Sequence, residues 1–213
     1  MRYIKFLSLA AIATAVTMAF IGMSSASATV FCSTTTTPCN AKWPATTVVD
    51  FSLDEGTSIK KTTTDGKTTL DTCTGSTKKF DITNPGNAVE TVTGVITDLT
   101  WSGCSFPTKT TQLCAIEFHN IAGTDNATVT ADGECKTTIN TVLFGSCVYG
   151  VIAGTHLGVL TGTTPERTRA TLDTSSVWEK ESGSEAACPA TAKETGTYIL
   201  TEPTNTDLYV EPS

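Results

Sequence analysis

The sequence is poor in the side chains on which most catalytic and metal sites depend. It has two histidines, His119 and His156, and no C-x-x-C pair, so zinc ligation is poorly supported. No G-x-S-x-G elbow precedes a helix, which argues against a nucleophile, histidine and acid triad. We therefore assign no catalytic residue and expect neither a metal nor another cofactor.

Basic residues are also scarce. Lys and Arg number 14 against 21 Asp and Glu, which gives a formal net charge of −7. A net acidic chain repels phosphate backbones, so nucleic acid is not an expected partner. Beyond the N-terminal segment no stretch is apolar enough to cross a bilayer, so we expect no membrane span once that segment is removed.

The N-terminal segment has the pattern of an export signal. Arg2 and Lys5 precede an uncharged, largely apolar run, and small residues follow it, ending Ala26-Ser27-Ala28. This pattern predicts a cleaved signal peptide over residues 1–28 and an extracellular or cell-surface location. Residues 29–213 are then enough for a single disulfide-bonded β domain with a real core.

Every cysteine follows the predicted cleavage site. An even number of cysteines in an exported chain predicts disulfides, here four. Spacing alone does not determine which cysteines pair. Pairing of neighbours would join Cys32–Cys39, Cys104–Cys114 and Cys135–Cys147, with Cys73–Cys188 closing the domain.

Threonine dominates the composition, with 45 residues in the chain. Its β-branched side chain suits strands, and period-two patterns with frequent turns predict an all-β fold, an antiparallel sandwich or an irregular barrel. In Thr47 to Leu53, Leu113 to His119 and Leu143 to Val151, alternate residues would face the core. In Val89 to Trp101 the alternation fails, because Val92 falls on one face and Val95, Leu99 and Trp101 on the other. A β-bulge at Gly94 would place all four on the inner side, and we predict one there.

Turn signals separate these runs. Asp65-Gly66 and Asp132-Gly133 each divide two polar and apolar runs, which is typical of a two-residue hairpin turn. Asn84-Pro85-Gly86-Asn87 predicts a further turn.

The spacing of cysteines and strands carries a family resemblance. The segments are FCSTTTTPC, DTCTGS, GVITDLTWSGC with a closely following LCAIEF, and ACPATAKETGTYILTEPTNTDLYV. This series is similar to a group of uncharacterised exported proteins of soil actinobacteria, over nearly all of the chain after the signal. The CTGS and GVITDLTWSGC portion also looks like small secreted proteins named as activators of alkane oxidation. The resemblance implies a secreted β fold and transfers no catalytic residue.

Two tryptophans are the candidate binding residues. Trp43 beside Pro44, and Trp178 next to Glu179 and Lys180, have polar sequence neighbours and could form an exposed stacking patch. The alternative is that each packs at the edge of the core. A loop from Ser105 to Leu113, if closed by Cys104 and Cys114, would suit an inhibitor or toxin-like module.

These observations favour a non-catalytic secreted or cell-envelope protein with a binding or surface-structural role. Its partner could be a glycan, an apolar small molecule or an envelope protein. An exposed aromatic strip would favour a glycan, and a closed apolar cavity would favour a lipid or hydrocarbon. The alternative is a secreted hydrolase that uses His156 or a carboxylate pair. The candidate carboxylates are Asp50, Asp54, Glu55, Asp98, Glu117, Glu179 and Glu181.

Overall fold

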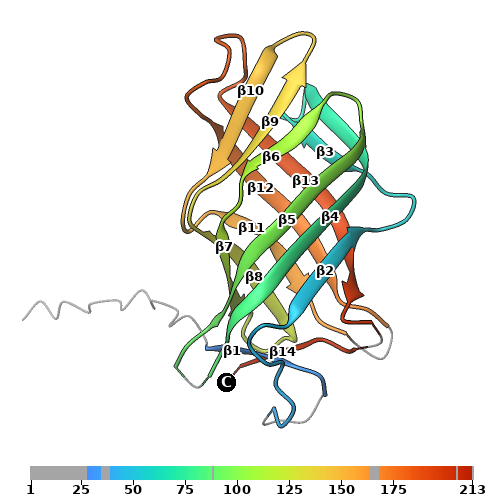
Figure 1. Ribbon diagram of the computed structural model, residues 1–213, viewed down its shortest axis with the longest axis vertical. Helices are drawn as coiled ribbons and strands as arrows, with labels where there is room; N and C mark the ends of the chain where they lie inside the picture. The colour runs from blue at the N-terminus through green and yellow to red at the C-terminus, as the bar shows by residue number, and fades with distance from the viewer. Residues whose placement is uncertain (1–27, 35–38, 88, 164–167, 205, 213) are drawn as a thin grey trace, which may run out of the picture.

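The computed structural model describes residues 28–34, 39–87, 89–163, 168–204 and 206–212. The predicted signal peptide, apart from Ala28, lies outside these residues. The described chain consists of antiparallel strands and turns, without a helix (Figure 1). It therefore contains no long apolar helix of the kind that crosses a membrane.

Eight strands close an antiparallel barrel, which we call the closed barrel. Around the ring, β4 pairs with β5, then β7, β8, β11, β12, β13 and β2 follow, and β2 pairs with β4 again. These eight strands form a closed ring, so the all-β prediction is confirmed and its barrel alternative is the correct one. The strands are β2 (Val48–Leu53), β4 (Thr69–Pro85), β5 (Val92–Cys104), β7 (Ala115–Asn120), β8 (Asn126–Asp132), β11 (His156–Thr161), β12 (Thr171–Lys180) and β13 (Thr191–Glu202).

Four further strands extend the molecule at the top of Figure 1. There they flank the upper ends of β4, β5, β12 and β13, and we call the whole region the upper half. They are β3 (Ile59–Thr62), β6 (Thr108–Gln112), β9 (Cys135–Thr141) and β10 (Gly145–Val151). β3 pairs with β4 and β13, β10 pairs with β12, and β9 lies between β10 and β6. At the opposite end, the base, β1 (Thr29–Cys32) pairs with β14 (Tyr209–Pro212).

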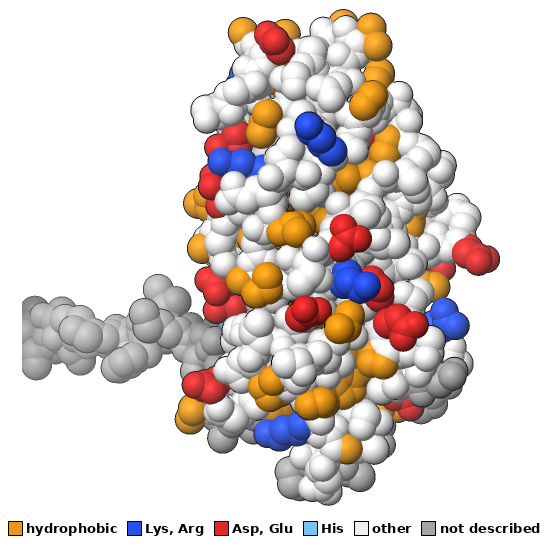
Figure 2. Space-filling model, viewed as in Figure 1, with side chains coloured by type: hydrophobic (Ala, Val, Ile, Leu, Met, Phe, Trp, Pro, Cys, Tyr) orange, Lys and Arg blue, Asp and Glu red, His pale blue; other side chains and the backbone are white. Residues whose placement is uncertain are grey.

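The two regions have different interiors. Aromatic rings fill the closed barrel: the ring centroid of Phe118 lies 4.9 Å from that of Phe31 and 5.3 Å from that of Phe80. The upper half buries Tyr149 and Leu70 together with cysteine sulfurs. Alternation along the strands produces both cores, because every second side chain points inward. On the face shown in Figure 2, polar side chains and backbone cover most of the surface, with hydrophobic and charged side chains scattered among them.

Four disulfides cross-link the chain, as predicted, but only one predicted pairing is correct. That pairing is Cys32–Cys39 near the base. The other three predicted pairings are wrong, because spacing in the sequence does not report which positions face each other. For example, β9 and β10 do pair, but Cys135 lies opposite Val151 and Cys147 lies opposite Ile139. The observed bonds, all in the upper half, are Cys73–Cys104, Cys114–Cys135 and Cys147–Cys188. The loop from Ser105 to Leu113 is therefore not closed by its flanking cysteines, and most of it forms β6.

The bulge in β5 lies three residues beyond its predicted position. Between Lys79 and Phe80 the register with β5 shifts, which leaves Thr97 as the extra residue. Val95, expected inside, is therefore exposed. Gly94 has a packing role instead, because a Cβ atom there would lie only 3.1 Å from the ring of Phe80.

The predicted hairpin turns have different outcomes. Asp65-Gly66 lies between the paired strands β3 and β4, and Gly66 has a positive φ, but the connection spans residues 63–68 and is longer than the predicted two-residue turn. Asp132-Gly133 does not form a hairpin, since β8 pairs with β7 and β11 while β9 pairs with β10 and β6. At this point the chain passes from the closed barrel into the upper half.

Candidate functional site

The two candidate tryptophans are both buried. Trp43 is 3% exposed and packs against Phe31, and Trp178 is 5% exposed and donates a hydrogen bond of 2.8 Å to Ser176 Oγ. The expected exposed patch is therefore wrong, and each indole packs within the core. The polar neighbours of Trp178 misled the prediction because adjacent residues of a strand face opposite sides, so Glu179 points outward.

A buried ionic layer, which we define as Lys61, Lys78 and Glu194, lies inside the molecule. Glu194 Oε1 accepts a hydrogen bond of 3.0 Å from Lys78 Nζ, and Glu194 Oε2 lies 3.3 Å from Lys61 Nζ. Aromatic rings contact both cations: Lys61 Nζ is 4.0 Å from the ring centroid of Trp101, and Lys78 Nζ is 4.8 Å from that of Tyr198. Each of the two ammonium groups thus pairs with the Glu194 carboxylate and also contacts the face of an aromatic ring.

For Lys61 and Glu194, burial and the neighbouring charges have opposing effects on the pKa. Burial lowers the pKa of Lys61, and the attraction of Glu194 only partly offsets it. For Glu194, burial alone would raise the pKa, but the neighbouring Lys78 and Lys61 outweigh it, so the pKa is lowered and the carboxylate stays ionised. Burial first, and Glu194 second, raise the pKa of Tyr198 well above its usual value.

Sequence analysis missed this layer because lysine in a threonine-rich strand normally indicates a solvated face. One signal was present: Lys61 shares the alternation of Ile59, which is fully buried. Lys78 likewise lies two residues before the core residue Phe80, and Glu194 two residues after the buried Ala192. A lysine in register with apolar residues is a candidate for an inward position.

The apolar space inside the closed barrel is small. A cavity of about 40 Å³ lies between Lys78 and the core residues Phe80, Ile116, Phe118 and Leu172. Pockets that hold small molecules usually measure about 300–1,000 Å³. This cavity is therefore too small to hold a lipid or a hydrocarbon chain.

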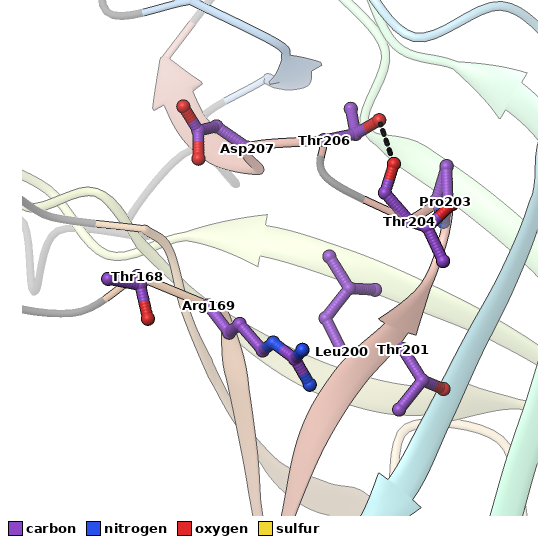
Figure 3. Close-up of a pocket in the computed structure, with 8 residues that line it drawn as sticks. All are labelled: Thr168, Arg169, Leu200, Thr201, Pro203, Thr204, Thr206 and Asp207. Atoms are coloured by element: carbon purple, nitrogen blue, oxygen red, sulfur yellow. Dashed lines mark hydrogen bonds between the residues drawn. The ribbon is translucent and has the colours of Figure 1, made fainter.

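A larger, polar hollow lies toward the base of the molecule, and we call it the base pocket (Figure 3). Its volume is about 490 Å³. It forms where the segment before β12, the end of β13 and the segment before β14 meet. The lining residues are Thr168, Arg169, Leu200, Thr201, Pro203, Thr204, Thr206 and Asp207.

The charged groups of the base pocket are accessible. The guanidinium of Arg169 lies beside Leu200 and Thr201 in Figure 3, and no carboxylate of the described residues forms an ion pair with it. Asp207 Oδ2 accepts a hydrogen bond of 3.2 Å from Tyr209 Oη. With its threonine hydroxyls the pocket offers donors, acceptors and one cationic fork that suits a planar anion.

Sequence patterns indicate the base pocket only weakly, because residues from three separate segments form it. One signal was available. Outside the predicted signal peptide, arginine occurs only as Arg167 and Arg169, two positions close together in the sequence.

The candidate hydrolytic residues do not come together. His119 Nε2 lies 3.2 Å from Glu117 Oε2, but these side chains share the outer face of β7. His156 is exposed at the start of β11, and no described serine or aspartate side chain is hydrogen bonded to its imidazole. Four of the hollows among the described residues have no pair of carboxylates in their lining. The geometry therefore gives the hydrolase alternative no support.

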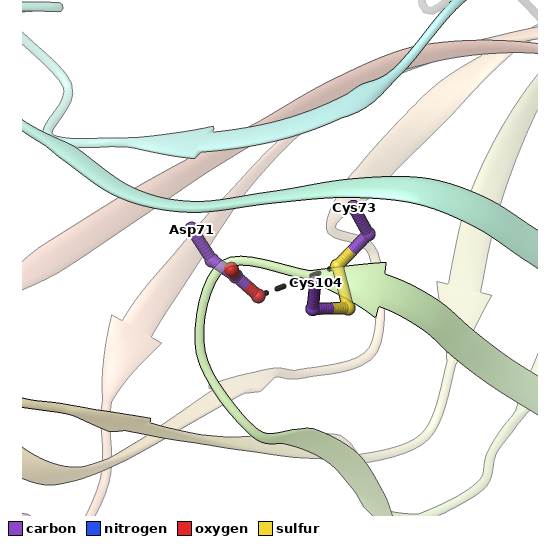
Figure 4. A group of neighbouring side chains, drawn as sticks. All are labelled: Asp71, Cys73 and Cys104. Carbon is purple, nitrogen blue, oxygen red and sulfur yellow. Dashed lines mark hydrogen bonds between the residues drawn. A yellow bond between two sulfur atoms is a disulfide. The ribbon is translucent and has the colours of Figure 1, made fainter.

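One group of side chains resembles a set of metal ligands but has another role (Figure 4). Asp71 lies beside Cys73 and Cys104, whose sulfur atoms are joined to each other and so cannot act as thiolates. The Asp71 carboxylate accepts hydrogen bonds from the backbone N–H of Phe106 at 3.1 Å and from the hydroxyl of Thr108. It thereby holds the turn that leads from β5 into β6.

No protein-family model, curated protein or solved structure matches this chain. The resemblance to exported proteins of soil actinobacteria, and to activators of alkane oxidation, therefore stays a prediction.

Proposed function

We propose that this chain is a non-catalytic secreted or cell-envelope protein that binds a polar, hydroxyl-rich ligand, such as a glycan, in the base pocket. The contrast between the hollows supports this function most directly. The base pocket measures about 490 Å³ and is polar, whereas the apolar cavity measures about 40 Å³. Four disulfides are compatible with an extracellular location.

The lining of the base pocket matches the chemistry of a sugar. Threonine hydroxyls both donate and accept hydrogen bonds, as sugar hydroxyls require. Leu200 and Pro203 add a small apolar surface for the C–H face of a ring. Arg169 favours a sugar that carries a carboxylate, because its guanidinium can bind both oxygens. No aromatic ring lines the pocket, so we expect weak affinity, with a Kd of about 1 mM.

The test is a titration of the oxidised full chain with neutral and acidic oligosaccharides, followed by NMR. We expect saturable shifts at Thr201 and Thr204, stronger for acidic than for neutral sugars. Arg169→Ala should weaken acidic sugars by about tenfold, which corresponds to one charge-assisted hydrogen-bonded pair. Lys109→Ala removes an exposed cation of β6 and serves as the matched control. Binding that is absent, or that shifts only residues outside the base pocket, would contradict the proposal.

A further inference from the structure

The ring of strands in the upper half has one discontinuity. β5 pairs with β4 along its whole length, but on its other edge it pairs with β7 only at Val92–Val95. One more backbone bond, 2.9 Å from Ile96 N to Cys114 O, ends that ladder. Beyond it the neighbouring strand is β6, which pairs with β9 instead (Figure 1). We call the stretch where residues 97–101 of β5 lie beside residues 110–113, at the end of β6 and just after it, the seam.

Along the seam the edge of β5 has no partner strand among the described residues, although the side chain of Thr110 bonds to one of its carbonyls. The carbonyl of Leu99 points into the seam, because Thr110 Oγ1 donates a hydrogen bond of 2.7 Å to it. In a strand, the N–H and C=O of one residue point to the same side, and the pattern repeats every second residue. The N–H groups of Leu99 and Trp101 therefore face the seam, where the described residues provide no partner strand. Such an edge is a template for another extended chain.

The seam contains a hollow of about 340 Å³. Thr110 lines this hollow, and its hydroxyl also accepts a hydrogen bond of 3.1 Å from Trp101 Nε1. Leu99 is buried and forms the floor, Leu113 is 39% exposed at the rim, and Asp98 adds an exposed carboxylate. The hollow thus combines an unpaired backbone edge, an apolar floor and one negative charge.

We propose that the seam binds an extended peptide segment of about three residues, which adds to the free edge of β5 through backbone hydrogen bonds. A peptide backbone presents donors and acceptors at the spacing of a strand, which neither an apolar molecule nor a simple ion does. An apolar central side chain covers Leu99 and Leu113, and a basic neighbour lies beside Asp98. The net charge of −7 adds a general attraction for basic segments.

Lys-X-Lys tripeptides with blocked ends, where X is Val, Leu, Ile, Phe or Tyr, test this proposal. Each is titrated into the oxidised full chain and followed by amide NMR. We expect shifts at Leu99, Trp101 and Leu113. The same peptide N-methylated at X keeps its charge and side chains but lacks one backbone donor, and it should bind at least tenfold more weakly.

Protein variants separate the seam from general charge attraction. Asp98→Lys should weaken binding by about tenfold, since it replaces attraction with repulsion beside the peptide. Glu55→Lys makes the same change of charge at an exposed turn remote from the seam in the sheet, and it should leave the affinity nearly unchanged. Both residues are exposed, so both variants should fold.

Three results would overturn the proposal. The first is equal binding of the N-methylated and unmethylated peptides. The second is that none of the five peptides shifts the seam amides at millimolar concentration. The third concerns the free protein: amides of Leu99 and Trp101 that exchange with deuterium as slowly as those of Val92–Val95 would show that the edge is already closed.

Discussion

The closed barrel and the upper half solve the same stability problem in different ways. In the closed barrel every neighbouring pair of strands is joined by backbone hydrogen bonds, and aromatic rings fill the interior. The upper half has the seam, and three of the four disulfides belong to it. Covalent bonds thus lie where the hydrogen-bonded ring is incomplete, which indicates that cross-links and ladder bonds substitute for each other in this fold.

The largest expected effect concerns the buried ionic layer, which joins the two regions. Lys61 lies on β3 of the upper half, whereas Lys78 and Glu194 lie on long strands that both regions share. Glu194→Gln leaves two buried ammonium groups without a counter-charge, so it should lower the free energy of unfolding by about 3–5 kcal/mol. Chemical denaturation measures this loss.

The matched control for that variant is Glu179→Gln on β12, whose carboxylate is exposed. It should change the free energy of unfolding by less than about 0.5 kcal/mol. If both variants unfold at the same denaturant concentration, the ionic layer does not stabilise the junction of the two regions.

The disulfides give the next largest effect. Cys147–Cys188 closes a sequence separation of 41 residues and Cys32–Cys39 one of 7. From the loop-closure entropy, replacing both cysteines by alanine should cost about 4 kcal/mol for the first bond and about 2 kcal/mol for the second. Hydrogen exchange should then be faster in β9 and β10 than in β7 and β8 for the first variant only. Equal costs would mean that the position of a bond in the fold outweighs its loop length.

The smallest effect is the pH dependence of stability. Glu194 has a lowered pKa, so its contribution is present above the unfolded value of 4.5 and is lost as pH falls through the folded pKa. Lys61 also has a lowered pKa. As pH rises from the folded pKa toward 10.5, Lys61 is neutral in the folded protein but still charged in the unfolded chain, so the free energy of unfolding rises. Tyr198 has a raised pKa, so stability falls as pH rises above 10.0.

Scanning calorimetry checks this profile. The Tm should rise from acid to mildly alkaline pH and fall beyond about pH 10, the usual range of tyrosine ionisation. The difference between the parent protein and Glu194→Gln should shrink at low pH, where Glu194 itself is protonated. A difference that stays constant down to acid pH would show that Glu194 is not ionised in the folded state.

The sequence predicts alternation well and three-dimensional neighbours poorly. Cys114, Ile116 and Phe118 were expected to face inward, and all three are buried. Leu143 was expected to share a face with Tyr149, yet it is exposed, because it lies in the turn between β9 and β10. Period-two patterning reports a local property of the backbone, and it fails where a strand ends.

Disulfide partners and the base pocket depend instead on the order of strands in the sheet. Cys73 faces Cys104 because β4 and β5 pair along their length, and nothing in the spacing of the cysteines indicates that pairing. The base pocket likewise needs the ends of β12, β13 and β14 to meet. Long-range pairing is a global property, so a single sequence does not reveal it.

The long strands β4, β5, β12 and β13 have an evolutionary consequence. Because each passes through both regions, no single cut of the chain releases either region intact. A duplicated or fused segment that contained only one of the two regions would have incomplete strands with exposed edges, and we expect it to aggregate. Insertions are tolerated at turns such as Asp65-Gly66, so this protein can gain new loops, but its two regions have to be inherited as one unit.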